Sequence, residues 1–181
     1  MEFNKPVSNP MLMGTIELMR EDDTPEHRNM FVEELTKGNF LSPALIDPEP
    51  AENAEGKLTI ASGSKVLFPM LTAPDGKKFF MAFTDALEYD KWQEKTRPLP
   101  TFALKFDDYA AMLFHKSSNE NTPQSFGFVI NPAGCNIIVP KGMVANIMAV
   151  RVAAAKQQAA KRQGMPPNMQ DIQPAPKPEN E

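Results

Sequence analysis

The sequence predicts an α+β fold, in which a mixed β-sheet of about six or seven strands follows an N-terminal helical hairpin and is flanked by further helices. Three observations predict it. Apolar residues recur at helical spacing within residues 9–37, where two cap-and-proline pairs mark two helix starts. From Phe40 onward the apolar runs are short and separated by turn residues, which is typical of strands. Helical segments interrupt the strands near residues 84–94 and 107–116.

Each helix of the hairpin has a recognisable start. In the first, Asn9 precedes Pro10, and Leu12, Ile16 and Met19 follow at i, i+4 and i+7. In the second, Thr24 is a hydroxyl cap before a proline and an acid, a combination that suits the positive end of the helix dipole. Gly38 is expected to end this helix in the left-handed conformation.

The strand segments are set apart by proline, glycine and acidic residues. Pro69 lies inside the run 65–73, so this strand is expected at an edge or a bulge. Asp75-Gly76 is a strong hairpin signal because it supplies positions with positive φ, and the nearly continuous apolar run 78–83 after it predicts a central strand. The expected strands are residues 40–46, 57–61, 65–73, 78–83, 101–106 and two around the turn 131–134.

Three regions are expected along the chain. Residues 1–150 form the domain, residues 151–163 extend its last helix with basic side chains, and residues 164–181 form a disordered tail. The tail is predicted disordered because it holds five prolines in 18 residues and few bulky side chains. A chain of 181 residues is long enough to bury a core without a metal or a disulfide.

Charge and composition limit the class of partner. The net charge is −4, and residues 151–181 carry five bases and three acids (+2), so the first 150 residues carry −6. This acidic body argues against nucleic acid as the main partner. One cysteine, no basic and apolar leader, and no apolar run of about 20 residues predict a cytoplasmic protein that does not enter a membrane.

Cys135 is the first candidate for chemistry. It follows the turn "NPAG" and precedes the apolar run 137–139, which favours the first residue of a strand buried on both faces. The alternative is a reactive thiol, which would need a basic neighbour such as His115 or His27. One cysteine and two histidines do not suggest a zinc site, and no cofactor is predicted.

The second candidate is the segment 85–92. Asp85 and Glu88 share one face of a short helix, where they are either helix-favouring acids or a carboxylate pair for acid–base work or cation binding. Tyr89 and Trp92 are three residues apart on the same helix, where aromatic rings either pack a helix onto a sheet or form a binding surface. The four residues together are the predicted binding surface.

Three stretches give the chain a family resemblance. These are "FVEELTKGNFLSPAL", "DGKKFFMAFTDALEYDKW" and "GFVINPAGCNIIV", in this order within residues 9–150. They resemble the N-terminal domain of the SseB family, named for enhanced serine sensitivity. The resemblance implies an α+β domain with a mixed sheet and supplies no established catalytic residues. Longer members of the family add a second domain, in whose place this chain has the basic helix and the proline-rich tail.

The leading hypothesis is therefore a non-catalytic cytoplasmic binding or adaptor domain for a protein partner of unknown identity. The first alternative is a small thiol- or carboxylate-dependent hydrolase that uses Cys135. The second alternative, suggested only by the family's name, is a module that senses an amino acid or another metabolite.

Overall fold

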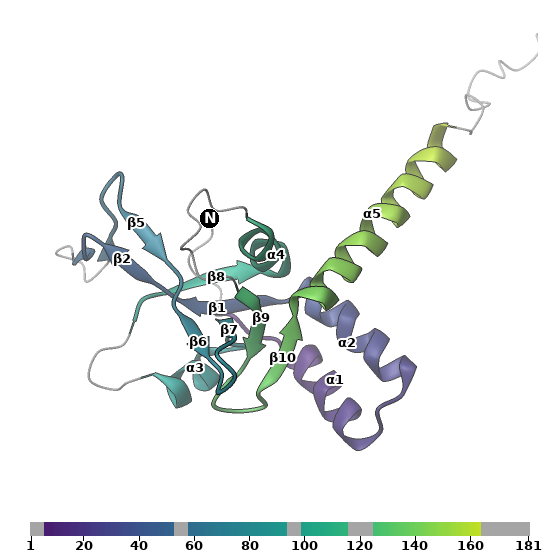
Figure 1. Cartoon of the computed structure of the whole chain (residues 1–181), viewed down its shortest axis with the longest axis horizontal. Helices are drawn as coiled ribbons and strands as arrows, with labels where there is room; N and C mark the ends of the chain where they lie inside the picture. Colours follow the sequence, from purple (N-terminus) through teal and green to yellow (C-terminus); the bar gives the residue numbers. More distant parts are fainter. Residues whose placement is uncertain (1–5, 53–57, 94–98, 116–124, 164–181) are drawn as a thin grey trace, which may run out of the picture. The chain divides into compact units, whose positions relative to one another are not determined.

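The computed structural model describes residues 6–52, 58–93, 99–115 and 125–163. Its helices are α1 (Pro10–Glu21), α2 (Pro25–Lys37), α3 (Ala86–Trp92), α4 (Phe106–Phe114) and α5 (Lys141–Gln163) (Figure 1). The α+β class and the N-terminal helical hairpin are thereby confirmed. None of the described helices combines the length and the apolar character that crossing a bilayer requires.

The chain separates into two units, residues 1–145 and residues 146–181, with the boundary inside α5. The domain boundary expected from the sequence lay five residues later, at 150/151. The predicted disordered tail, residues 164–181, lies outside the described residues.

A four-stranded mixed sheet forms the centre of the first unit. It consists of β6 (Met70–Thr72), β7 (Lys78–Ala82), β9 (Ser125–Ile130) and β10 (Ile137–Pro140) in the order β10-β9-β7-β6. β7 and β9 run parallel, and the two outer pairs are antiparallel. The predicted central position of the run 78–83 is thus correct. Pro69 comes just before β6, an edge strand, where a missing N–H costs least.

The other strands form three antiparallel pairs. β1 (Asn39–Pro43) pairs with β8 (Thr101–Lys105), β2 (Leu45–Asp47) with β5 (Lys65–Leu67), and β3 (Ala51–Glu52) with β4 (Leu58–Thr59). Leu41 and Phe83 exchange two backbone hydrogen bonds of 2.9 Å. This bridge joins the β1–β8 pair to the chain that leaves β7. Where the sequence predicts one mixed sheet of about six or seven strands, the described residues form a four-stranded mixed sheet and three two-stranded pairs.

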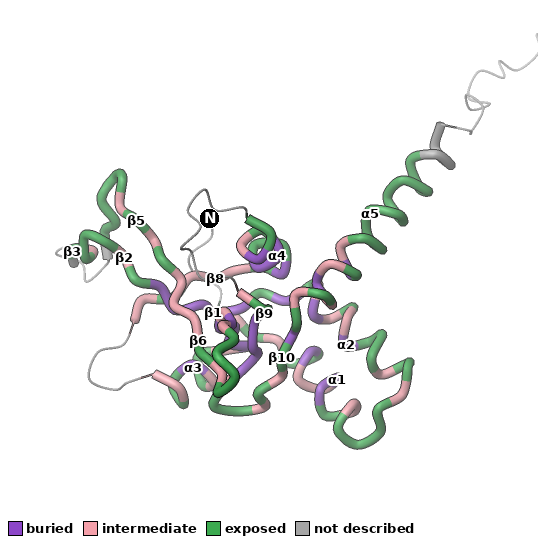
Figure 2. The backbone as a smooth tube through the Cα atoms, in the orientation of Figure 1, coloured by how far each residue is buried: buried purple, intermediate pink, exposed green. Residues whose placement is uncertain are grey.

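Core side chains cover both faces of the sheet, and buried residues gather on β1, β7, β9 and α4 (Figure 2). On one face the cluster consists of Phe79, Met81, Phe83, Tyr89 and Val129. On the other face Phe128 stacks on Tyr109 of α4, with the ring centroids 4.6 Å apart. Tyr109 is fully buried, and its hydroxyl donates to the Met81 carbonyl at 2.8 Å. Burial raises the pKa of this phenol, so it stays protonated and keeps α4 attached to β7.

The two helices of the hairpin begin differently. The Thr24 hydroxyl accepts from the backbone N–H of His27 at 3.2 Å, which is the predicted cap. The Asn9 side chain does not cap α1. Its Nδ2 instead donates to the carbonyls of Asn39, at 2.6 Å, and Thr84, at 2.8 Å. Asn9 therefore connects the start of α1 to β1 and to the end of β7.

The left-handed conformation expected at Gly38 is wrong, because its φ is −62°. Glycine is needed there for space. A Cβ at this position would lie 2.6 Å from Cζ of Phe40, whose ring is fully buried. The Phe40 ring of β1 therefore leaves no room for a side chain at position 38.

A β-bulge in β9 changes which face its side chains occupy. Lys78 pairs with Ser125 and Phe79 pairs with Gly127, so Phe126 is an extra residue on the β9 side. Gly127 has φ +156°, and a Cβ there would overlap the carbonyl oxygen of Val139 in β10. The close approach of β9 to β10 at this point therefore requires a glycine.

We predict that Gly127→Ala lowers the free energy of unfolding by about 2 kcal/mol or more, because β10 must move away or the backbone must change conformation. Gly14→Ala is the matched control. Gly14 lies inside α1 with no atom within 4 Å of an added Cβ, so alanine there should stabilise the protein by about 0.5–1 kcal/mol. Urea unfolding measures both. Equal effects of the two variants would contradict this description of the bulge.

Candidate functional site

The parallel strands β7 and β9 finish side by side at one end of the sheet, and several polar side chains lie close together there. The amide of Asn131, which follows β9, spans this junction. Its Oδ1 accepts from the backbone N–H of Thr84 at 2.9 Å, and its Nδ2 donates to the Thr84 hydroxyl at 2.8 Å. Its backbone N–H donates to the Ala82 carbonyl at 2.9 Å. Thr84 and Asn131 are fully buried, so these hydrogen bonds satisfy groups that water does not reach.

The turn from β9 to β10 is built on the same asparagine. The Asn131 carbonyl accepts from the backbone N–H groups of Gly134, at 2.8 Å, and Asn136, at 2.9 Å. Asn131 and Asn136 have φ values of 48° and 50°, a left-handed conformation that asparagine tolerates better than most residues.

Cys135 therefore lies in the turn, and its predicted place as the first residue of a strand buried on both faces is wrong. The strand begins two residues later, at Ile137, and its residues alternate in exposure. Ile138 is 53% exposed, so one face of β10 is open. The sequence suggests burial on both faces because every residue of the run "IIV" is apolar, but only one face of β10 is covered by neighbouring elements.

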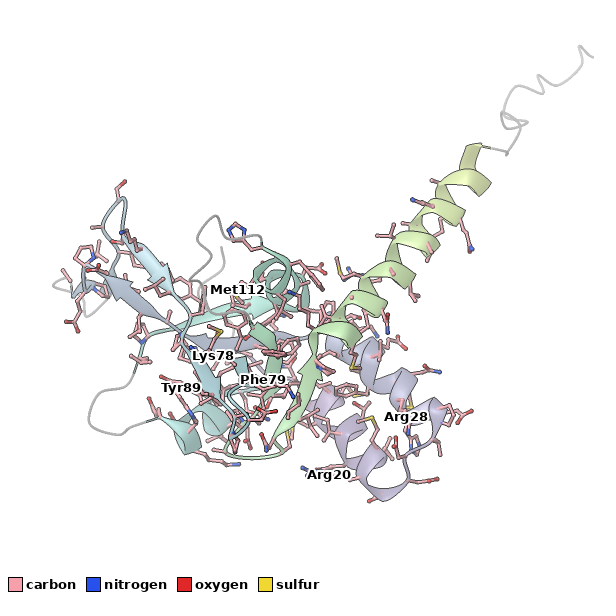
Figure 3. The ribbon with its side chains drawn as sticks, in the orientation of Figure 1. Arg20, Arg28, Lys78, Phe79, Tyr89 and Met112 are labelled. Carbon is pink, nitrogen blue, oxygen red and sulfur yellow. The ribbon has the colours of Figure 1, made fainter. Side chains whose placement is uncertain are left out.

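The environment of the Cys135 thiol disfavours the thiolate. Sγ is half-buried and lies 3.6 Å from the Ile130 carbonyl. Burial raises the pKa of this thiol, while a backbone hydrogen bond from Ile137 and the positive charge of Arg20 act in the opposite direction. Arg20, at the end of α1 (Figure 3), donates to the backbone carbonyl of Cys135 at 2.8 Å.

Neither histidine supplies a base to this thiol in the described part of the chain. His115 is exposed at the C-terminal end of α4, and the groups that act on Cys135 do not include it. His27 lies in the first turn of α2, where Nδ1 is 2.6 Å from the Asp22 carbonyl.

The two predicted carboxylates lie beside the turn that holds Cys135. Asp85 caps α3 by accepting from the backbone N–H of Glu88 at 2.9 Å, and its second oxygen accepts from the Thr84 hydroxyl at 3.0 Å. Glu88 pairs with Lys91 through Oε1. Its Oε2 is buried without a hydrogen-bond partner among the described residues, against Gly134. The fold thus brings Asp85, Glu88 and Cys135 to the same edge of the sheet.

The two predicted aromatic residues pack into the core cluster. Tyr89 is 7% exposed, and its hydroxyl donates to the Leu99 carbonyl at 2.7 Å. The Phe83 ring lies 5.3 Å from that of Tyr89 and 5.5 Å from that of the half-buried Trp92. Figure 3 labels Tyr89 on α3 and Phe79 on β7, which belong to this one cluster. As a binding surface, the segment 85–92 stays a prediction.

The structure also contains an apolar groove that the sequence did not indicate. It lies on the sheet face that carries Phe79, at the end opposite the contact between Asn131 and Thr84. Its volume is about 500 Å³, and it is lined by Ala73, Pro74, Asp75, Lys77, Phe79, Phe126, Ile138 and Pro140. Phe126 and Ile138 are 47% and 53% exposed, and Phe79 forms a buried floor. Lys77 lies over the Phe126 ring, 5.8 Å from its centroid, and pairs with Asp75 at 2.8 Å.

No metal site is evident in the described segments, because no three acidic, cysteine or histidine side chains there are grouped as metal ligands would be. A second, smaller pocket of about 200 Å³ lies where α1 begins and α2 ends, and Asn9, Lys37 and Gly38 are among its lining residues.

These features define a small α+β domain. Hydrogen bonds between Asn131 and Thr84 join β7 and β9 at one end of its mixed sheet, and an apolar groove lies open on one face. The family model described as the SseB protein N-terminal domain matches residues 13–146. The chain belongs to the SseB family, as the resemblance of its three stretches indicated. No curated protein and no solved structure matched the chain in the corresponding comparisons.

We predict that Cys135 reacts with iodoacetamide at pH 7 about tenfold more slowly in the native protein than in the chain unfolded in urea. Burial lowers access to Sγ, and the raised pKa reduces the thiolate fraction at every pH below it. The midpoint of the rate against pH should accordingly lie above that of the unfolded chain. A native rate that exceeds the unfolded rate at neutral pH would mean that the thiol is activated.

Proposed function

We propose that this protein is a non-catalytic binding domain, and that it recognises an extended segment of a protein partner through the groove between the β6–β7 hairpin and β10. The observation that carries the proposal is the pair of half-exposed side chains, Phe126 and Ile138, which line the groove together with the buried Phe79 ring. Apolar side chains that converge on one concave surface, with few polar groups, are typical of binding sites.

The β-bulge supports a specific role for Phe126. Because Phe126 and Gly127 together oppose Phe79, the bulge turns the Phe126 side chain toward the face that Phe79 occupies. This arrangement requires a glycine at position 127, and it leaves the apolar Phe126 ring partly exposed to water. Bulges that re-aim a side chain are common near functional sites.

The position of β10 supports an extended ligand. β10 is the outermost strand of the four-stranded sheet, next to the groove. A segment that adds to such an edge makes backbone hydrogen bonds and directs alternate side chains toward one face. Here that face holds Ile138 and Pro140, which line the groove.

The polar residues at the opposite end of the sheet support a non-catalytic role. Asp85 and Asn131 are engaged in the cap and the strand junction. Among the described residues the groups that act on the Cys135 thiol include no histidine to serve as its base, and the nearby Glu88 carboxylate raises the pKa of the thiol and so disfavours the thiolate. A hydrolase that uses Cys135 would need such a base. The single cysteine fits a reducing compartment, so a cytoplasmic location is part of the proposal.

We predict that peptides selected by display against the wild-type protein lose about tenfold or more in affinity for Ile138→Asp and for Phe126→Ala. Leu87→Asp is the matched control, since Leu87 is 75% exposed on α3 and does not line the groove. Fluorescence anisotropy gives the affinities, and thermal unfolding confirms that each variant is folded. Peptides that bind Ile138→Asp as tightly as wild type, or that lose affinity with Leu87→Asp, would exclude this groove as the site.

A further inference from the structure

The helical segment 146–163 carries a concentrated positive charge. It contains Arg151, Lys156, Lys161 and Arg162 and no acidic residue, which is a net charge of +4. Residues 149–159 are all exposed, and Val150 and Val152 are 69% and 51% exposed. Because most of the stability of a helix in a protein comes from packing of its apolar side chains, a partner that covered Val150 and Val152 would stabilise this segment.

The α1–α2 hairpin, residues 10–37, carries the opposite charge. It holds seven acids and three bases, a net charge of −4. Its bases are already engaged: Arg20 donates to the Cys135 carbonyl, Arg28 pairs with Asp23 at 2.5 Å, and Lys37 pairs with Glu33 at 2.7 Å and Glu34 at 3.0 Å.

Four acidic residues of the hairpin have no ion-pair partner among the described residues: Glu17, Glu21, Asp22 and Glu26. All four are exposed. The hairpin also exposes Met11 and Met30, at 64% and 43%. It therefore presents acids and apolar side chains together, which matches the basic and apolar character of the segment 146–163.

We propose that the segment 146–163 of one molecule docks on the α1–α2 hairpin of a second copy of this chain. The two surfaces are complementary in sign and equal in magnitude, and both mix charge with exposed apolar side chains, as the rim and core of protein interfaces do. A nucleic acid fits less well, because the remainder of the chain has a net charge opposite to that of the segment and repels phosphates. This inference is independent of the proposed groove.

The test is sedimentation equilibrium of the full chain at about 0.01 M and about 1 M salt, between which the screening length falls from about 30 Å to about 3 Å. We expect a concentration-dependent dimer at low salt that dissociates at high salt. Two variants reverse the charges: the helix variant carries Lys156→Glu and Lys161→Glu, and the hairpin variant carries Glu17→Lys and Glu21→Lys. Each should weaken dimerisation by about tenfold.

A mixture of the two variants separates contact between molecules from contact within one. A mixed pair regains one complementary contact, from the intact hairpin of the helix variant to the intact helix of the hairpin variant. The mixture should therefore associate more strongly than either variant alone. Lys65→Glu with Lys105→Glu is the matched control, because both lysines are exposed on strands outside the two surfaces, and it should leave dimerisation within about twofold of wild type. Circular dichroism verifies that the helices persist.

A monomer at low salt and high concentration would overturn the proposal. So would a dimer that neither the salt nor the two charge-reversal variants weaken, or a mixture that associates no better than its components. Binding of a single-stranded polynucleotide probe by the wild type but not by the helix variant, without dimerisation, would assign the segment to nucleic acid instead.

Discussion

The junction between the parallel strands β7 and β9 is the constraint on which the rest of the structure depends. Parallel neighbours cannot be joined by a tight hairpin, so the chain leaves β7 and returns to β9 43 residues later. The Asn131 amide closes this junction by binding the backbone and the hydroxyl of Thr84. The same residue starts the β9–β10 turn, and Asn9 attaches α1 to the Thr84 carbonyl. Each buried group left unpaired would cost about 1–3 kcal/mol, so the elements that meet here depend on one another.

The polar side chains at this junction hydrogen-bond to one another and to the backbone, so they are not free to bind a ligand. The residues that the sequence marks as candidates for chemistry lie where the strands end: Asp85 caps α3, Glu88 pairs with Lys91 and lies against Gly134, and Cys135 is half-buried in the turn. The opposite end of the same sheet face has few polar groups and exposes Phe126 and Ile138. The sheet is thus closed by hydrogen bonds at one end and exposes apolar side chains at the other, an arrangement that suits recognition by a preformed surface.

The elements that the sequence predicts well are those with local signals. Thr24, the Asp75-Gly76 hairpin and the central strand 78–83 each depend on a few neighbouring residues, although only Gly76 of the hairpin pair has positive φ. The left-handed conformation predicted for Gly38 is wrong because the Phe40 ring, rather than the backbone angle of a helix end, requires a glycine at this position. The bulge at Phe126 depends on register with β7, which no local pattern encodes. The candidate site is partly predictable: local patterns single out the segment 85–92, whereas the contact between Asn131 and Thr84 spans 47 residues and has no local signal.

Native-state hydrogen exchange at two amides tests this account most directly. The N–H of Thr84 donates to Asn131 Oδ1, and the N–H of Asn131 donates to the Ala82 carbonyl. If the junction holds the fold together, both amides exchange only through global unfolding, and their exchange free energies equal that of unfolding measured in denaturant. Exchange through local opening, with a free energy close to that of an exposed loop, would show that this edge of the sheet is a mobile site and would contradict its structural role.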